Sequence, residues 1–330
     1  MAMSSRFSAV AVAIALLLVG SGCGSSSDSG SGGDDQSGAV TGTVPASFIE
    51  DPPADLVKSA GISPAAANAG VALARKLTWQ YVQAGGVTQA AACTGSGSPT
   101  VVYSNGLLLQ AAWTWPVVAT EQAKTNRVCM FDRPGTGLSP ARPPGAATNG
   151  PVANANEMFA LLAALNEKGP FVLVGWSYGG MVVRTAAATQ PDQTAGMSLI
   201  DAVVPSQYRT FDRSGWEEGG TPLDMKAAET AVDGGADLGA KPLVVLEAGQ
   251  DPGSGSAAQN EWSRVQQASL SISTNAVYGV VPKASHPIPQ QSPQSVEAAG
   301  RVIMASISAG NPMPSCPAEF GKNGIVCQKA

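Results

Sequence analysis

The chain has 330 residues, and its 24 acidic and 19 basic side chains leave a formal net charge of −5. Charged residues make up 13% of the chain, about half of the ~25% usual for soluble domains. A mildly acidic chain without basic runs is not suited to bind nucleic acid. A single histidine, His286, and the lack of a Cys-x-x-Cys pair argue against a tetrahedral zinc site. We therefore expect neither a nucleic-acid partner nor a bound metal.

The N-terminal segment has the pattern of a secretory signal. After Arg6 come 13 uncharged residues, FSAVAVAIALLLV, whereas a membrane-spanning helix needs about 20. The small residues before Cys23 resemble the lipobox at which bacterial lipoproteins are cut and acylated. We expect residues 1–22 to be a lipoprotein signal peptide and Cys23 to carry lipid, which would anchor the exported protein to a membrane outside the cytoplasm. The alternative is an ordinary secretory signal with an incidental cysteine.

A Gly/Ser-rich tract follows Cys23 and contains GSSSDSGSGGDDQSG. Such a tract has no apolar side chains to pack, so it behaves as a flexible spacer. The sequence therefore predicts a tether over residues 23–45 and one folded domain over residues 46–330.

Four of the five cysteines remain once Cys23 is assigned to the anchor: Cys93, Cys129, Cys316 and Cys327. An even number in an exported protein favours disulfides. Cys316 and Cys327 enclose a short stretch of the tail at residues 311–330, so we expect them to pair locally. This leaves Cys93 to pair with Cys129, and free buried thiols are the alternative.

Short apolar runs alternate with helical patterns through the body of the chain. Near-continuous Val, Leu and Ile are typical of strands buried on both faces of a parallel sheet. Such runs lie at residues 100–104, 127–131, 171–174, 197–200, 243–247 and 276–281. Apolar spacing and caps predict helices at residues 152–168, at 181–189 and after Ser292-Pro293. The alternation predicts an α/β fold with a mostly parallel, twisted sheet and helices on both faces.

A hairpin is predicted upstream of these elements. Residues 79–83 and 87–91 flank Gly85-Gly86, which is the pattern of two antiparallel strands joined by a tight turn.

The pattern Gly-x-Ser-x-Gly occurs at Gly175–Gly179. The bare pattern is weak, but here it follows a buried-strand run and precedes a helical one. Ser177 is therefore predicted on a sharp strand-to-helix turn at the carboxyl edge of the sheet, where open α/β sheets bind ligands. The N–H groups that open the helix would favour a developing oxyanion there.

Four signals in chain order make the sequence resemble the α/β-hydrolase superfamily over about residues 75–310. The first is Asn105-Gly106, which stands where the family has its His-Gly oxyanion loop. The second is the stretch at residues 131–139 (FDRPGTGLS), which resembles the family's Asp-Arg-x-Gly-x-Gly-x-Ser turn. The third and fourth are the Gly175–Gly179 elbow and His286, which follows the last strand. The resemblance implies an α/β-hydrolase fold with a short lid insertion at about residues 206–240 and no cofactor.

The resemblance also assigns roles to the reacting groups. A serine hydroxyl needs a base, so Ser177 would attack, His286 would transfer the proton, and an aspartate would orient the imidazole. Asp251 and Asp201 both follow strands. We favour Asp251, because the family has the chain order Ser-Asp-His and places its acid after the strand that corresponds to residues 243–247. Asp201 is the reserve acid.

The oxyanion hole is expected to use the backbone N–H groups of Leu107 and Tyr178. Asn105 replaces the family's histidine, which backbone donation does not require. Trp113 and Trp176 are candidates to line a substrate pocket. For Trp113, as for Trp115, a position in the core is the alternative.

Taken together, these features predict a lipid-anchored serine hydrolase that cleaves an ester, thioester or amide of a small-molecule acyl substrate through an acyl-enzyme. Carboxylesterase chemistry is the first expectation, and a same-triad aminopeptidase or perhydrolase stays open. A catalytically inactive, ligand-binding relative is the other alternative. Ser177 excludes haloalkane dehalogenases and epoxide hydrolases of this fold, which carry aspartate at that position.

Overall fold

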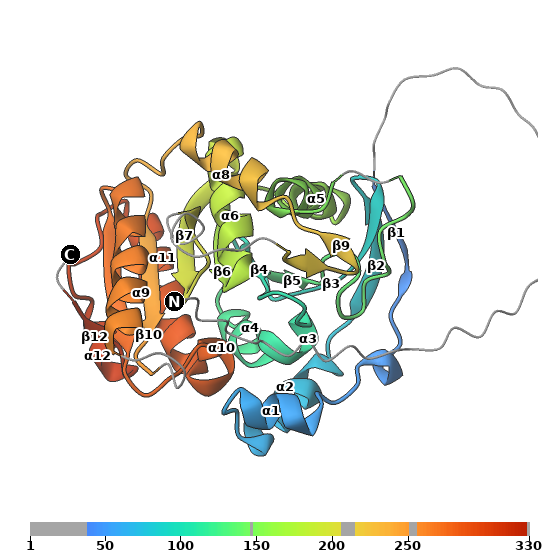
Figure 1. Cartoon of the computed structure of the whole chain (residues 1–330), viewed down its shortest axis with the longest axis horizontal. Coiled ribbons are helices and arrows are strands. Elements are labelled where there is room, and N and C mark those ends of the chain that lie inside the picture. The colour runs from blue at the N-terminus through green and yellow to red at the C-terminus, as the bar shows by residue number, and fades with distance from the viewer. Residues whose placement is uncertain (1–37, 146–147, 206–214, 251–255, 329–330) are drawn as a thin grey trace, which may run out of the picture. The chain divides into compact units, whose positions relative to one another are not determined.

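The computed structural model describes residues 38–145, 148–205, 215–250 and 256–328. The six predicted apolar runs form its central strands, which pair in parallel (Figure 1). They are β4 (Val101–Ser104), β5 (Val128–Phe131), β6 (Phe171–Trp176), β7 (Thr194–Ile200), β10 (Leu243–Ala248) and β11 (Ala276–Val281). Nearly all their residues are buried because helices cover both faces, which explains why the runs show no polar alternation.

Antiparallel strands extend the sheet at both edges. The predicted hairpin is confirmed as β2 (Trp79–Ala84) and β3 (Val87–Thr94), and β3 pairs antiparallel with β5. At the far edge, β12 (Val326–Cys327) pairs antiparallel with β11. With β1 (Ala39–Thr43) beside β2, the ten-stranded order is β1-β2-β3-β5-β4-β6-β7-β10-β11-β12.

Strand β1 corrects one predicted boundary, because it lies inside the expected tether of residues 23–45. Its side chains are mostly exposed, so pairing with β2, not burial of apolar groups, holds it in the sheet. The Gly/Ser-rich composition from which the tether is predicted gives no indication of such a strand. Residues 1–37, including the predicted signal peptide and Cys23, lie outside the described part of the chain.

Helices build one apolar core on each face of the sheet. Alternate residues of β4 point to different cores, since Val102 packs with one cluster and Val101 and Tyr103 with the other. The first face carries α5 (Pro151–Ala164), α6 (Tyr178–Thr189) and α9 (Ser256–Ala268). The second carries α2 (Pro64–Ala74), α3 (Ala111–Thr114), α4 (Pro116–Gln122), α11 (Pro293–Ala309) and α12 (Ala318–Lys322).

The remaining short elements connect these layers: α1 (Ala54–Ser59), α10 (Ile288–Gln291), and the 3₁₀ turns Ala46–Phe48, Pro191–Gln193 and Ser269–Ile272. The helix predicted after Ser292 is α11. However, the Ser292 hydroxyl lies 2.8 Å from that of Ser295 and makes no capping bond to the backbone.

The described part of the expected lid insertion is small. It consists of the hairpin β8 (Glu217–Glu218) and β9 (Thr221–Pro222), followed by α8 (Met225–Asp233). Helix α8 packs on α6 and α5 (Figure 1). Residues 206–214 of the insertion lie outside the described residues.

Both predicted disulfides are present. Cys93 on β3 pairs with its register partner Cys129 on β5, and Cys316 pairs with Cys327 on β12. Across the described ranges, no helix has the length and apolar character needed to cross a membrane.

Candidate active site

Ser177 lies on the sharp turn between β6 and α6 that the sequence predicts. Its φ is +53°, a conformation that costs energy for a residue with a side chain. The turn depends on close backbone approach at its two glycines. A Cβ on Gly175 would lie 2.4 Å from the carbonyl oxygen of Gly179, and one on Gly179 would lie 2.2 Å from that of Ser104. Only glycine fits at these two positions, so the motif is the nucleophile-elbow turn.

His286 connects Ser177 to a carboxylate. Its Nε2 lies 2.9 Å from the Ser177 Oγ, and its Nδ1 lies 2.6 Å from Oδ2 of Asp201. His286 follows β11, while Ser177 and Asp201 follow the neighbouring strands β6 and β7. The carboxyl edge of the sheet thus brings together three groups that lie far apart in the chain.

The carboxylate beside His286 belongs to the reserve acid. The sequence favours Asp251, whereas within the described residues Asp201 is the acid whose carboxylate lies at Nδ1, where an acid can orient the ring. Asp251 itself lies outside the described residues. Asp201 comes directly after β7, and its N–H donates to the carbonyl of Leu246 over 2.6 Å. The backbone of the sheet therefore fixes the position of this carboxylate.

Two further donors hold the Asp201 carboxylate. Its Oδ1 accepts the backbone N–H of Ala248 over 3.1 Å and the indole N–H of Trp262 over 2.8 Å. Trp262 lies on α9, and sequence patterns give no sign of its role because the contact arises only when α9 packs beside β10.

The predicted oxyanion loop passes directly beside Ser177. A Cβ on Gly106 would lie 3.3 Å from Cβ of Ser177 and 3.1 Å from the ring of Trp176. The two predicted donors belong to these adjoining segments, since Leu107 follows Gly106 and Tyr178 opens α6. The structure thus brings both segments together at Ser177.

Asp132 fastens the oxyanion loop to the next turn. Its Oδ1 accepts the N–H of Ala111 over 2.6 Å and the Asn105 amide over 3.3 Å, and its Oδ2 accepts the N–H of Leu138 over 2.9 Å. Burial raises the pKa of Asp132 to about 7, while the two backbone N–H groups act to lower it. Asn105, which replaces the family's histidine, thereby keeps a polar link within the loop.

Trp176 supports the loop that carries His286. Its indole N–H donates to the carbonyl of His286 over 2.8 Å, and the two ring centroids are 5.4 Å apart. Trp113 and Trp176 both line an apolar pocket of about 50 Å³ together with Leu109, Pro287 and residues of α1 and α2. Trp115, by contrast, is fully buried in the core.

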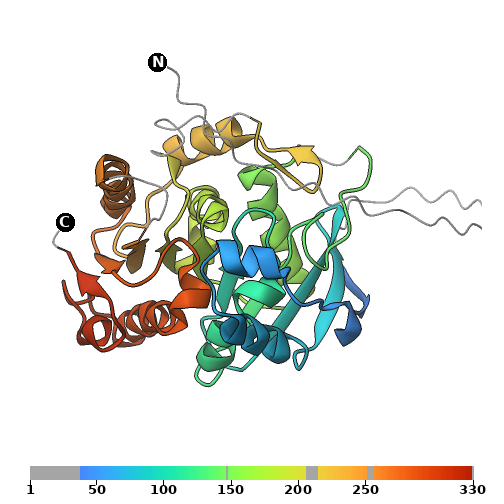
Figure 2. The same cartoon turned by 60° about the horizontal axis from the view of Figure 1, so that its bottom comes forward.

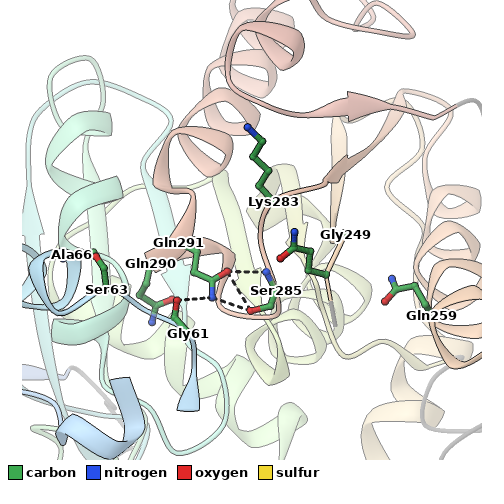
Figure 3. Close-up of a pocket in the computed structure, with 10 residues that line it drawn as sticks. Gly61, Ser63, Ala66, Gly249, Gln259, Lys283, Ser285, Gln290 and Gln291 are labelled. Carbon is green, nitrogen blue, oxygen red and sulfur yellow. Dashed lines mark hydrogen bonds between the residues drawn. The ribbon is translucent and has the colours of Figure 1, made fainter. Parts of the chain in front are cut away.

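A larger, polar hollow of about 740 Å³ lies on the side of the His286 loop where β10 and β11 end (Figure 3). Gln291 bridges its walls. The side-chain oxygen accepts the N–H of Ser285 over 2.8 Å, and the side-chain amide donates to the carbonyl of Ala60 over 2.8 Å. This amide joins the residue before His286 to the N-terminal helices, a link that local sequence patterns do not reveal.

Comparison with known proteins places this geometry in a family. A family model described as the alpha/beta hydrolase fold matches residues 99–270. The uncharacterized protein YqjL of Bacillus subtilis (strain 168) is 25% identical over 215 residues, covering 62% of this chain and 83% of the relative. An uncharacterized vacuolar membrane protein of Saccharomyces cerevisiae is 35% identical over 89 residues, which cover 27% of this chain. The chain spans 14% of the length of that yeast protein.

Solved structures share the fold at low identity. A thermophilic esterase from Thermogutta terrifontis has a TM-score of 0.50 and 22% identity, covering 67% of this chain and 94% of the esterase. Epoxide hydrolase VrEH1 from Vigna radiata has a TM-score of 0.52 and 12% identity, covering 70% of this chain and 98% of that enzyme. Since an esterase and an epoxide hydrolase both superpose, the fold alone does not select the reaction. The family model covers more than half of the chain, and the protein belongs to the α/β-hydrolase fold family.

Proposed function

We propose that this protein is a serine hydrolase that cleaves a carboxylic ester of a small-molecule acyl compound through an acyl-enzyme. The observation that carries the proposal is the hydrogen-bonded series from Ser177 through His286 to Asp201, with spacings of 2.9 and 2.6 Å. A serine hydroxyl is activated when a base lies within hydrogen-bond distance of it and an acid orients that base. An epoxide hydrolase of this fold would need aspartate in place of Ser177.

In the proposed mechanism, the Ser177 oxygen attacks the ester carbonyl while Nε2 of His286 accepts the hydroxyl proton. Asp201 accepts the N–H at Nδ1, which keeps the ring in the reactive tautomer and stabilises the imidazolium that forms. The N–H groups of Leu107 and Tyr178 stabilise the oxyanion. His286 then gives its proton to the leaving alcohol, and water releases the acyl group by the same steps.

The apolar pocket beside Trp176 is the proposed site of the acyl group. It is next to the reacting groups, because Trp176 precedes the nucleophile and Pro287 follows the base. A volume of about 50 Å³ favours a short acyl chain over a long one.

A series of p-nitrophenyl esters tests the activity and the pocket together. We expect turnover of acetate and butyrate esters, a steep fall for chains of eight carbons or more, and none above background for Ser177→Ala. A fluorophosphonate probe should label the wild type and not the variant. A wild type that neither labels nor turns over any ester would support a ligand-binding role instead. Labelling without ester turnover would favour the aminopeptidase or perhydrolase alternative.

We also propose that the protein is exported and anchored to a membrane by lipid on Cys23, on the strength of the N-terminal sequence pattern. The wild type made in a bacterial host should partition into the detergent phase of a Triton X-114 extraction, and Cys23→Ala should move to the aqueous phase. Ester hydrolysis by the variant serves as the control for correct folding. Equal partitioning of the two proteins would contradict lipidation.

A further inference from the structure

A buried ion pair links the lid hairpin to the core of the molecule. The guanidinium of Arg133 contacts the carboxylate of Glu218 at two points, Nε to Oε2 over 2.6 Å and Nη2 to Oε1 over 2.7 Å. The two side chains are 1% and 0% exposed. Arg133 follows β5, whereas Glu218 is the last residue of β8, so the pair joins segments 85 residues apart.

The remaining hydrogen bonds of this pair go to the oxyanion loop. Arg133 donates from Nη1 to the carbonyl of Asn105 and from Nη2 to that of Gly106, each over 2.8 Å. Oε1 of Glu218 accepts the N–H of Leu108 over 3.0 Å. The pair therefore holds the backbone on both sides of Leu107, whose N–H is one of the two proposed oxyanion donors.

The bond from Arg133 to the carbonyl of Gly106 determines the direction in which the N–H of Leu107 points. The carbonyl of Gly106 and the N–H of Leu107 belong to one planar, trans peptide unit, so they point in opposite directions. Fixing the carbonyl on Arg133 therefore fixes the direction of the N–H. The same guanidinium lies 4.9 Å from the ring centroid of Tyr178, the residue with the other proposed donor.

Stability alone is a poor explanation for burying these two charges. Removing both ions from water is costly, and apolar side chains of similar size often stabilise a fold equally well. Burial acts to lower the pKa of Arg133, but the charge and hydrogen bonds of Glu218, together with Tyr178 and Asp132, outweigh burial and raise that pKa. The directed donors and acceptors of the pair can orient a backbone, which apolar side chains cannot do.

The hairpin that carries Glu218 is seated too closely to shift freely. A Cβ on Gly135 would lie 2.6 Å from the Cα of Gly219, and one on Gly219 would lie 3.0 Å from the carbonyl of Pro134. The carbonyl of Glu218 also accepts the Asn149 amide over 3.0 Å. The hairpin is therefore anchored to the turn that follows β5 and contains Arg133.

We infer that Glu218 and Arg133 are positioning residues, through which the lid hairpin holds the oxyanion loop in its reactive orientation. This inference rests on the proposed function. Neither residue needs to touch the substrate, because each acts through the peptide groups that surround Leu107. The expected signature is a loss of kcat with little change in KM, since the oxyanion exists only after attack on the ester.

The double variant Arg133→Met/Glu218→Leu tests this inference. It leaves no unpaired buried charge, so we expect its urea midpoint to stay near that of the wild type. We expect kcat to fall by about 10²-fold, the loss typical of one misdirected oxyanion donor, with KM within about threefold and slower fluorophosphonate labelling. The matched control is Arg127→Met/Glu167→Leu, which should keep wild-type kcat. It removes an ion pair at the opposite end of β5, where Nε and Nη2 of Arg127 both contact Oε1 of Glu167.

The possible outcomes separate the two hypotheses. A wild type without hydrolase activity would overturn the proposed function, whereas an active, folded Arg133→Met/Glu218→Leu protein with wild-type kcat would overturn this inference. If that double variant unfolds, Glu218→Gln decides, because it keeps the shape of the side chain and one acceptor. A fall in kcat for Glu218→Gln at unchanged KM would support the inference, and an unchanged kcat would contradict it.

Discussion

Asp201→Asn is expected to lower kcat by about 10⁴-fold, the loss typical of replacing the acid of a Ser-His-Asp triad. Asparagine matches the shape of the carboxyl group, and one oxygen can still accept the N–H groups of Ala248 and Trp262. The atom facing Nδ1 of His286 would then be an NH₂ group, which donates a hydrogen bond. This stabilises the tautomer with its proton on Nε2, and that tautomer cannot accept the proton of Ser177.

Asp251→Asn is the matched control for this prediction, since the sequence alone favours Asp251 as the acid. We expect its kcat/KM for p-nitrophenyl acetate to equal that of the wild type within error. Both variants should be compared with the wild type in urea unfolding, so that a loss of folded protein is not counted as a loss of catalysis. A larger loss for Asp251→Asn than for Asp201→Asn would reverse the assignment made from the geometry.

His286→Ala should lower kcat by about 10⁵- to 10⁶-fold, the loss typical of removing the base of such a triad. The chain contains no second histidine, so no other imidazole can take over. Because the His286 side chain is 49% exposed, its removal should leave the free energy of unfolding nearly unchanged. Activity measured with p-nitrophenyl acetate, alongside a urea titration, checks both expectations.

Added imidazole gives this second prediction a positive test. Removal of an exposed ring leaves an open space beside the Ser177 oxygen, and free imidazole at millimolar concentration should enter it and restore part of the activity. Ser177→Ala should show no rescue. Lys283→Ala, which removes the other basic side chain near this loop, should keep wild-type kcat. A large loss for Lys283→Ala, or an active His286→Ala, would contradict the role of His286.

The sequence predicts the central strands well for a physical reason. Strands covered on both faces need apolar side chains at every position, so runs such as those of β6 and β10 stand out from their surroundings. The Ser177 turn can be predicted equally well, because the backbone passes so close to Gly175 and Gly179 that only glycine fits there. Strand β1 is held by pairing with β2, and the exposed residues Ala39–Thr43 give no comparable signal.

The acid and the positioning residues depend on how distant segments pack. Asp201 and Asp251 both follow apolar runs in the sequence, and the pairing of β7 with β10 and of β10 with β11 brings Asp201 and His286 to the same edge of the sheet. Glu218 meets Arg133 across 85 residues. Nothing around Glu218 marks the contact, because a glutamate in the lid insertion looks in sequence like any charge on a solvated surface.

The N-terminal helices have a consequence for where substrate preference would be set under the proposed function. Helices α1 and α2 form one wall of the apolar pocket, and Gln291 ties their connection to the His286 loop. Both helices precede residue 99, where the match to the family model begins. If the pocket binds the acyl group as proposed, substitutions at Leu56 or Ala60 would alter which acyl groups enter and leave the proposed reacting residues unchanged. The proposed acyl site therefore joins residues that precede the family match, such as Leu56, to residues within it or after it, such as Trp113 and Pro287.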